Sequence, residues 1–213
     1  RIGTVGGVFV ISREAALGVP APAFEATYYA SQVAQDGALL YWSFDEAQGG
    51  ALQRSPLGVP TVGAANDLVS VAGAGRVSVM DVGGPEKLGR AADLNGANFF
   101  QASALNAGRA SINPPWVVEF WMQAAGDNTG NRADYMINFG TYPGGDNAPA
   151  FIYDFEPDAL EVYAGGAGRT GGSPALNDSD WHHVVWAYYG DGASGGANRL
   201  ELYVDGALFG DVR

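Results

Sequence analysis

The chain has 213 residues, no cysteine, and a formal net charge of −12 that comes from 23 acidic and 11 basic side chains. The lack of cysteine excludes disulfides and thiolate metal sites. An acidic surface repels phosphate backbones and anionic headgroups, so we expect no nucleic-acid binding. No apolar run is long enough to insert into a membrane. The 32 glycines, spread between aromatic-rich segments, are typical of many strands joined by tight turns.

Residues 1–23 are predicted to form a strand followed by a linker. The strand, residues 1–12, is β-branched and apolar, with a glycine pair that suggests a bend or bulge and four consecutive apolar residues: Val8, Phe9, Val10 and Ile11. Pro20 and Pro22 favour a linker before the main body of the chain. We expect residues 24–213 to form one domain.

The only expected helix lies at the start of that domain. Residues 24–35 carry aromatic and aliphatic pairs four residues apart, and Gly37 provides a C-terminal stop. The spacing then changes to two, which predicts a strand with Leu40, Trp42 and Phe44 on one face.

The pattern of the remaining residues predicts strands. They are expected at 76–82, 91–94, 98–102, 116–123, 134–139, 149–155, 159–164, 181–189 and 199–205. Asp205-Gly206 is a strong signal for a two-residue hairpin into a further strand at 207–212. Strands at this spacing without intervening helices indicate an antiparallel sandwich or barrel.

Five segments resemble, in chain order, the signature segments of laminin-G-like domains in the concanavalin A-like superfamily. They are YWSFDE followed by a glycine (41–49), GRAADLNG (89–96), VEFWM (118–122), WHHVV (181–185) and LYVDG (202–206). The resemblance implies an all-β antiparallel jelly-roll sandwich introduced by one short helix. It also implies an extracellular or cell-surface location in bacteria or phage, and non-catalytic recognition of glycan or protein surfaces, as in adhesion.

The chain departs from this family at its end. Family members continue past the Asp-Gly hairpin to a closing strand that pairs beside the opening strand, whereas this sequence ends at Arg213. We therefore expect a sandwich with an open edge, which pairs readily with any available strand. Residues 1–12 supply one, either within the same chain or inserted into the next copy. Insertion into the next copy would build an extracellular filament.

Glycoside hydrolysis is the least favoured alternative. Glu156, Asp158 and Glu161 resemble the acid cluster of retaining glucanases, which share this fold. That chemistry requires two carboxylates about 5 Å apart on one face. Because Pro157 does not fit a strand ladder, residues 149–164 are better explained as a hairpin with these acids at its tip. We expect no enzymatic activity.

Calcium is the one cofactor candidate. Asp127, Asn128, Asn131 and Asp134 crowd one segment, and hard oxygen ligands suit Ca²⁺. The alternative is an ordinary polar loop, in which such side chains stabilise turns. The alternative is favoured because no fixed ligand spacing is present.

Aromatic residues are the candidates for glycan contact. Tyr142, Tyr163, Tyr188 and Tyr203 are expected to face outward, where a ring can stack on a sugar, although cross-strand packing is the commoner role. His182 and His183 are neighbours on a predicted strand and should point to opposite faces, so they do not ligate one metal. Structural roles are expected for both.

Overall fold

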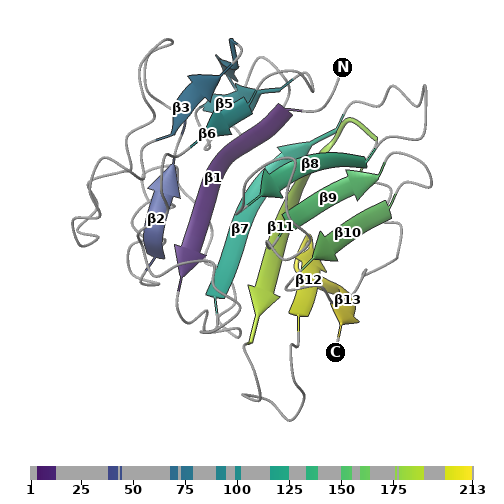
Figure 1. Ribbon diagram of the computed structural model, residues 1–213. Helices are drawn as coiled ribbons and strands as arrows, with labels where there is room; N and C mark the ends of the chain where they lie inside the picture. The colour runs from purple at the N-terminus through teal and green to yellow at the C-terminus, as the bar shows by residue number, and fades with distance from the viewer. Residues whose placement is uncertain are drawn as a thin grey trace, which may run out of the picture.

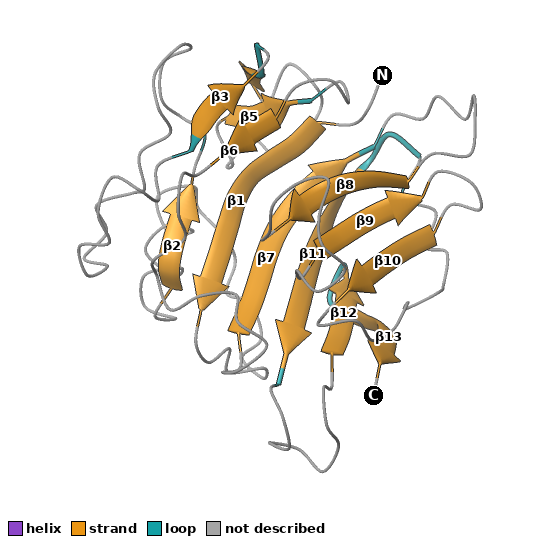
Figure 2. Cartoon of the chain, viewed as in Figure 1, coloured by secondary structure: helices purple, strands orange, loops and turns teal. Residues whose placement is uncertain are grey.

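The described part of the chain consists of strands. The computed structural model describes residues 4–12, 38–42, 44, 68–71, 73–78, 90–94, 99–101, 116–124, 133–138, 150–154, 159–163, 176, 178–189 and 200–212. Every element in these ranges is a strand, and every pairing is antiparallel (Figure 2). These ranges contain no helix suited to crossing a membrane. The predicted linker at 13–23 and helix at 24–35 lie outside them.

The strands follow the sequence prediction closely. They are β1 (Thr4–Ser12), β2 (Ala38–Trp42), β3 (Val69–Val71), β4 (Gly75–Ser78), β5 (Arg90–Asp93), β6 (Phe99–Gln101), β7 (Trp116–Gln123), β8 (Ala133–Asn138), β9 (Ala150–Asp154), β10 (Ala159–Tyr163), β11 (Trp181–Tyr188), β12 (Leu200–Val204) and β13 (Ala207–Val212). Strand β3 was not expected, because its three residues are too few for a recognisable alternation.

The strands form three sheets (Figure 1). The largest has eight strands in the order β13-β12-β11-β7-β1-β5-β4, and β2 also pairs with β1. A second sheet has the order β10-β9-β8, and β3 pairs with β6 in a third. In Figure 1 the second sheet lies in front of β11 and β12, and Ile137 of β8 packs against the core of the large sheet.

Strand β1 is the central connection of the large sheet. One of its edges pairs with β7. Its other edge is shared, because β5 pairs with Thr4–Gly6 and β2 pairs with Phe9–Ser12. Among the described strands, β2, β4 and β5 therefore reach β7 only through β1. The register between β1 and β7 shifts between Gly6 and Val10, so the ladder is irregular at the glycine pair, where a bend or bulge was predicted.

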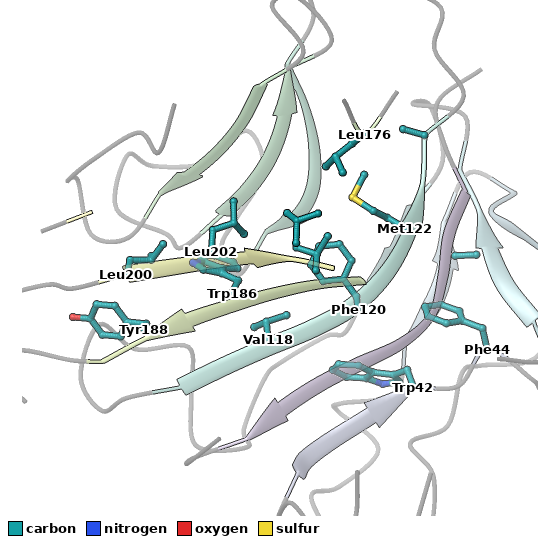
Figure 3. Packing of buried hydrophobic residues seen from close by; sticks show 14 residues of the cluster. Trp42, Phe44, Val118, Phe120, Met122, Leu176, Trp186, Tyr188, Leu200 and Leu202 are labelled. Atoms are coloured by element: carbon teal, nitrogen blue, oxygen red, sulfur yellow. The ribbon is translucent and has the colours of Figure 1, made fainter. Parts of the chain in front are cut away.

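The hydrophobic core lies on one face of the large sheet (Figure 3). Side chains on a strand alternate between faces, and the register aligns every second residue of β7, β11 and β12. The aligned core residues are Val118, Phe120 and Met122, Val184, Trp186 and Tyr188, and Leu200, Leu202 and Val204. The described side chains of these sets are buried, so they form the core face of the large sheet.

Asp205, Gly206 and Phe44 have positive φ for different reasons. Asp205 and Gly206 have φ values of 50° and 79°, the signs that a type I′ hairpin turn requires, so the predicted hairpin is confirmed. Phe44 has a φ of 62°, which is unfavourable for a bulky residue. Its ring is 1% exposed and meets Phe100 edge to face at 5.5 Å, so packing offsets the backbone strain.

We predict that Trp186→Ala destabilises the protein by about 3–5 kcal/mol, because it removes a fully buried ring and leaves a cavity. Val185→Ala is the matched control, since Val185 is the preceding residue on β11 and is only half-buried on the opposite face. It should cost about 1 kcal/mol or less. Urea unfolding measures both. Equal losses for the two variants would contradict the assignment of the core face.

Candidate binding face

The face opposite the core carries a different set of side chains. We call it the outer face and define it by the described residues that alternate with the core positions. They are Val117, Glu119, Trp121 and Gln123 on β7, Trp181, His183, Val185 and Ala187 on β11, and Glu201 and Tyr203 on β12. Val117, Ala187 and Glu201 are buried, and the others are half-buried. The outer face thus carries aromatic, acidic, amide and aliphatic side chains.

Trp121 and His183 form the centre of this face. They are opposite each other in the register of β7 and β11, and their rings lie 5.0 Å apart with a 31° tilt. Glu119 lies beside them, with its Oε1 3.3 Å from Nε2 of His183. On the other side of Trp121, the register places Gly6 of β1, which has no side chain. The result is a stacked aromatic pair with an acidic neighbour.

Three ring nitrogens on this face make no hydrogen bond. They are Nε1 of Trp121, Nε1 of Trp181 and Nε2 of His183, and all three atoms are buried. The 3.3 Å contact of His183 with Glu119 is therefore close but lacks hydrogen-bond geometry. A buried donor or acceptor without a partner costs about 1–3 kcal/mol. Three such atoms near one another make this the least satisfied polar region among the described residues.

A buried carboxylate occupies the β12 side of the outer face. Glu201 is 3% exposed, and its Oε2 accepts hydrogen bonds from the hydroxyls of Tyr189 at 2.5 Å and Tyr203 at 2.7 Å. Partial burial and the hydrogen bond to Glu201 raise the pKa of Tyr189 well above its usual value. These contacts satisfy a charged group that burial would otherwise destabilise.

The tyrosines predicted to contact glycans fall in different places. Tyr203 lies on the outer face as expected, but its hydroxyl is used by Glu201. Tyr188 is 1% exposed and belongs to the core, so its predicted outward placement is wrong. Tyr188 lies two and four residues after Trp186 and Val184 on β11, so all three side chains point to the same, inward face. Tyr163 ends β10 opposite Ala150, and Tyr142 lies outside the described residues.

The predicted calcium segment is mostly outside the described ranges. Asp127, Asn128 and Asn131 lie there, while Asp134 is in β8 opposite Tyr153. Among the described residues, no three His, Asp or Glu side chains are grouped so as to hold a metal ion. The calcium hypothesis stays a prediction.

The acid cluster falls at the β9–β10 hairpin. The pairing of Asp154 with Ala159 confirms that 149–164 contains a hairpin. The predicted place of Glu161 at the hairpin tip is wrong, because Glu161 lies within β10 opposite Ile152. Glu156 and Asp158 lie outside the described residues. The predicted assembly residues Val8, Phe9, Val10 and Ile11 are all part of β1.

Sequence patterns did not predict which side chains the strand register brings together. The Trp121–His183 pair, the role of Glu119 beside it and the burial of Glu201 all depend on which residues of β7, β11 and β12 lie opposite one another. Alternation within VEFWM and WHHVV was the available signal. It gives the face of each residue but not its cross-strand neighbour.

Comparisons with known proteins found no counterpart. A scan against models of protein families, a search of curated proteins and a search of solved structures each gave no match. The laminin-G-like resemblance therefore rests on the five sequence segments.

We predict that Tyr189→Phe destabilises the protein by about 1–2 kcal/mol, because it removes a donor from the buried carboxylate of Glu201. The same substitution in a Glu201→Leu background should cost much less. Chemical unfolding of the two single variants and the double variant gives the coupling energy. Simple additivity would show that the tyrosine does not act through Glu201.

Proposed function

We propose that this chain is a non-catalytic recognition module, exported to the cell exterior, that binds a neutral glycan through the outer face. The observation that carries the proposal is the stacked Trp121–His183 pair beside Glu119, with unsatisfied ring nitrogens around it. An aromatic face packs against the C–H face of a sugar ring, and a carboxylate accepts hydrogen bonds from its hydroxyls.

We further propose a laminin-G-like jelly-roll sandwich as the framework. Three observations support it. All five resembling segments contain strands of the one eight-stranded sheet: β2, β5, β7, β11 and β12. Strand β1 pairs beside β2, the position that a closing strand takes in that family. A second antiparallel sheet contributes Ile137 to the core.

Charge selects among ligands. The chain carries a net charge of −12, and Glu119 lies within the aromatic pair's immediate surroundings. Both features repel anionic glycans and favour a neutral, hydroxyl-rich ligand. Protein recognition is the competing possibility, and aromatic side chains suit that role as well.

The carboxylates of the outer face suit binding better than hydrolysis. Retaining glycosidases need two carboxylates, one acting as nucleophile and one as acid. On β7, β11 and β12, the described carboxylates of this face are Glu119 and Glu201, and Glu201 is buried with two tyrosine hydroxyls on one of its oxygens. That arrangement gives Glu201 a structural role.

A second candidate function is filament assembly by exchange of β1. This strand bridges β7 to β2 and β5, and residues 13–37 separate it from β2. A connection of that length reaches on the order of 80 Å when extended. A neighbouring copy is therefore able to supply the same central strand with the same pairing, which would link copies head to tail.

We predict that Trp121→Ala abolishes glycan binding and that Glu119→Gln weakens it about tenfold or more, because these changes remove the stacking surface and a charged acceptor. Val69→Ala is the control, since Val69 is 53% exposed on β3, which is not part of the large sheet. A glycan array identifies the ligand, and calorimetry then measures the affinity of each variant. Binding that survives Trp121→Ala would remove the outer face as the site.

We predict that the variant Ser12→Cys/Val117→Cys forms an intrachain disulfide, because these residues are Cα partners in the β1–β7 ladder. The natural chain has no cysteine, so the product is unambiguous. Non-reducing electrophoresis separates a monomer, expected for pairing within the chain, from the ladder of species that strand exchange would give. Each single-cysteine variant is a control for random oxidation.

A further inference from the structure

His182 lies at the start of β11 and holds a carboxylate with each of its ring nitrogens. Nδ1 is 2.8 Å from Oδ2 of Asp205, and Nε2 is 3.1 Å from Oδ1 of Asp178. The His182 side chain is 13% exposed, whereas those of Asp178 and Asp205 are 41% and 52% exposed. Two aspartates from different segments therefore meet at one imidazole.

One carboxylate belongs to the β12–β13 turn. Asp205 is in the left-handed conformation that this turn requires. Its Oδ1 accepts a hydrogen bond from the backbone N–H of His183 at 2.9 Å, and its own N–H donates to the carbonyl of His183 at 2.8 Å. The turn is thus fixed to β11 by contacts additional to the one with the His182 ring.

The other carboxylate belongs to the segment 178–180 before β11. Asp178 Oδ1 also accepts the N–H of Asp180 at 2.8 Å. The segment is joined to the end of β7 by two bonds: Ser179 N–H to the carbonyl of Ala124 at 3.2 Å, and Gln123 Nε2 to the carbonyl of Ser179 at 2.7 Å. His182 thus links this segment to the hairpin turn.

The protonation state of His182 decides how many of these contacts exist. An imidazolium donates from both nitrogens, whereas a neutral imidazole donates from only one. Burial lowers the pKa of His182, but the hydrogen bonds and charges of Asp205 and Asp178 outweigh it and raise the pKa above 6.5. Burial opposes ionisation of Asp178, yet its bonds to Asp180 and His182 lower its pKa below 3.8.

We propose that His182 is a protonation-dependent clamp that holds segment 178–180 to the β12–β13 turn and releases that segment when the imidazole loses its proton. The neutral ring keeps the shorter bond to Asp205 and gives up the longer one to Asp178. This inference concerns the end of the sheet and does not depend on glycan binding.

The sign of the pH dependence follows from these groups. The contribution of His182 is fully present below pH 6.5 and is lost as pH rises through its higher folded pKa. The contribution of Asp178 to stability is present above pH 3.8 and is lost as pH falls through its lower folded pKa.

The residue opposite His182 on β7 is the uncharged Met122. His183 and Glu119 lie on the opposite face, and Asp180 follows in the same segment.

The test uses the two histidines, which are the only ones in the chain. Nitrogen-detected NMR titration should show the ring of His182 protonated on both nitrogens at pH 6 and deprotonated at Nε2 above its pKa. Protection factors from hydrogen exchange, corrected for the intrinsic rate, should fall roughly threefold or more at Ser179 and Asp180 between pH 6 and pH 8.5. The amide of His183, bonded to Asp205, should keep its protection.

Variants separate the clamp from general effects of pH. His182→Gln should remove the pH dependence at Ser179 and Asp180, and His183→Gln should leave it intact. Asp178→Asn, which changes only an exposed group, should lower the pKa of His182 and give weak protection of the segment already at pH 6. A neutral His182 ring at pH 6, constant protection in the natural chain, or the same pH dependence in His182→Gln would each overturn the proposal.

Discussion

The backbone ladder of β1 holds the large sheet together. Two groups of strands, β7 with β11 to β13 on one side and β2, β4 and β5 on the other, share no described pairing except through β1. The register shifts between Gly6 and Val10, and both ends of the strand pair with β7. Because β1 pairs with β2, β5 and β7, it places Trp42 of β2 and Ala92 of β5 in the same core cluster as Phe120 of β7.

Once the ladder is fixed, the alternation of side chains produces two different faces. The core face is almost purely apolar, while the outer face gathers Trp121, His183 and Glu119. His182 and His183 illustrate the separation, since the first contacts Asp178 and Asp205 and the second contacts Trp121 and Glu119. Their predicted opposite orientation is confirmed, and each residue has its own set of polar partners.

The sequence predicted the strands well because alternation and the Asp205-Gly206 turn are local signals. It predicted the site poorly because cross-strand neighbours depend on register, which is a property of two distant segments. The outward placement of Tyr188 was a different kind of error. Tyr188 is two residues from Trp186 on the same strand, so alternation alone places both side chains on one face. The burial of Glu201 beneath two tyrosine hydroxyls had no local signature in the sequence.

The place of β1 in the middle of the sheet is tested most directly by hydrogen exchange of its backbone amides. The structure predicts that the amides of Val5 and Ile11 exchange as slowly as those of β7 and β11, because all of them open only when the sheet unfolds. If the β1 amides exchange rapidly while those of β7 and β11 stay protected, β1 is not the strand that joins the two halves of the sheet.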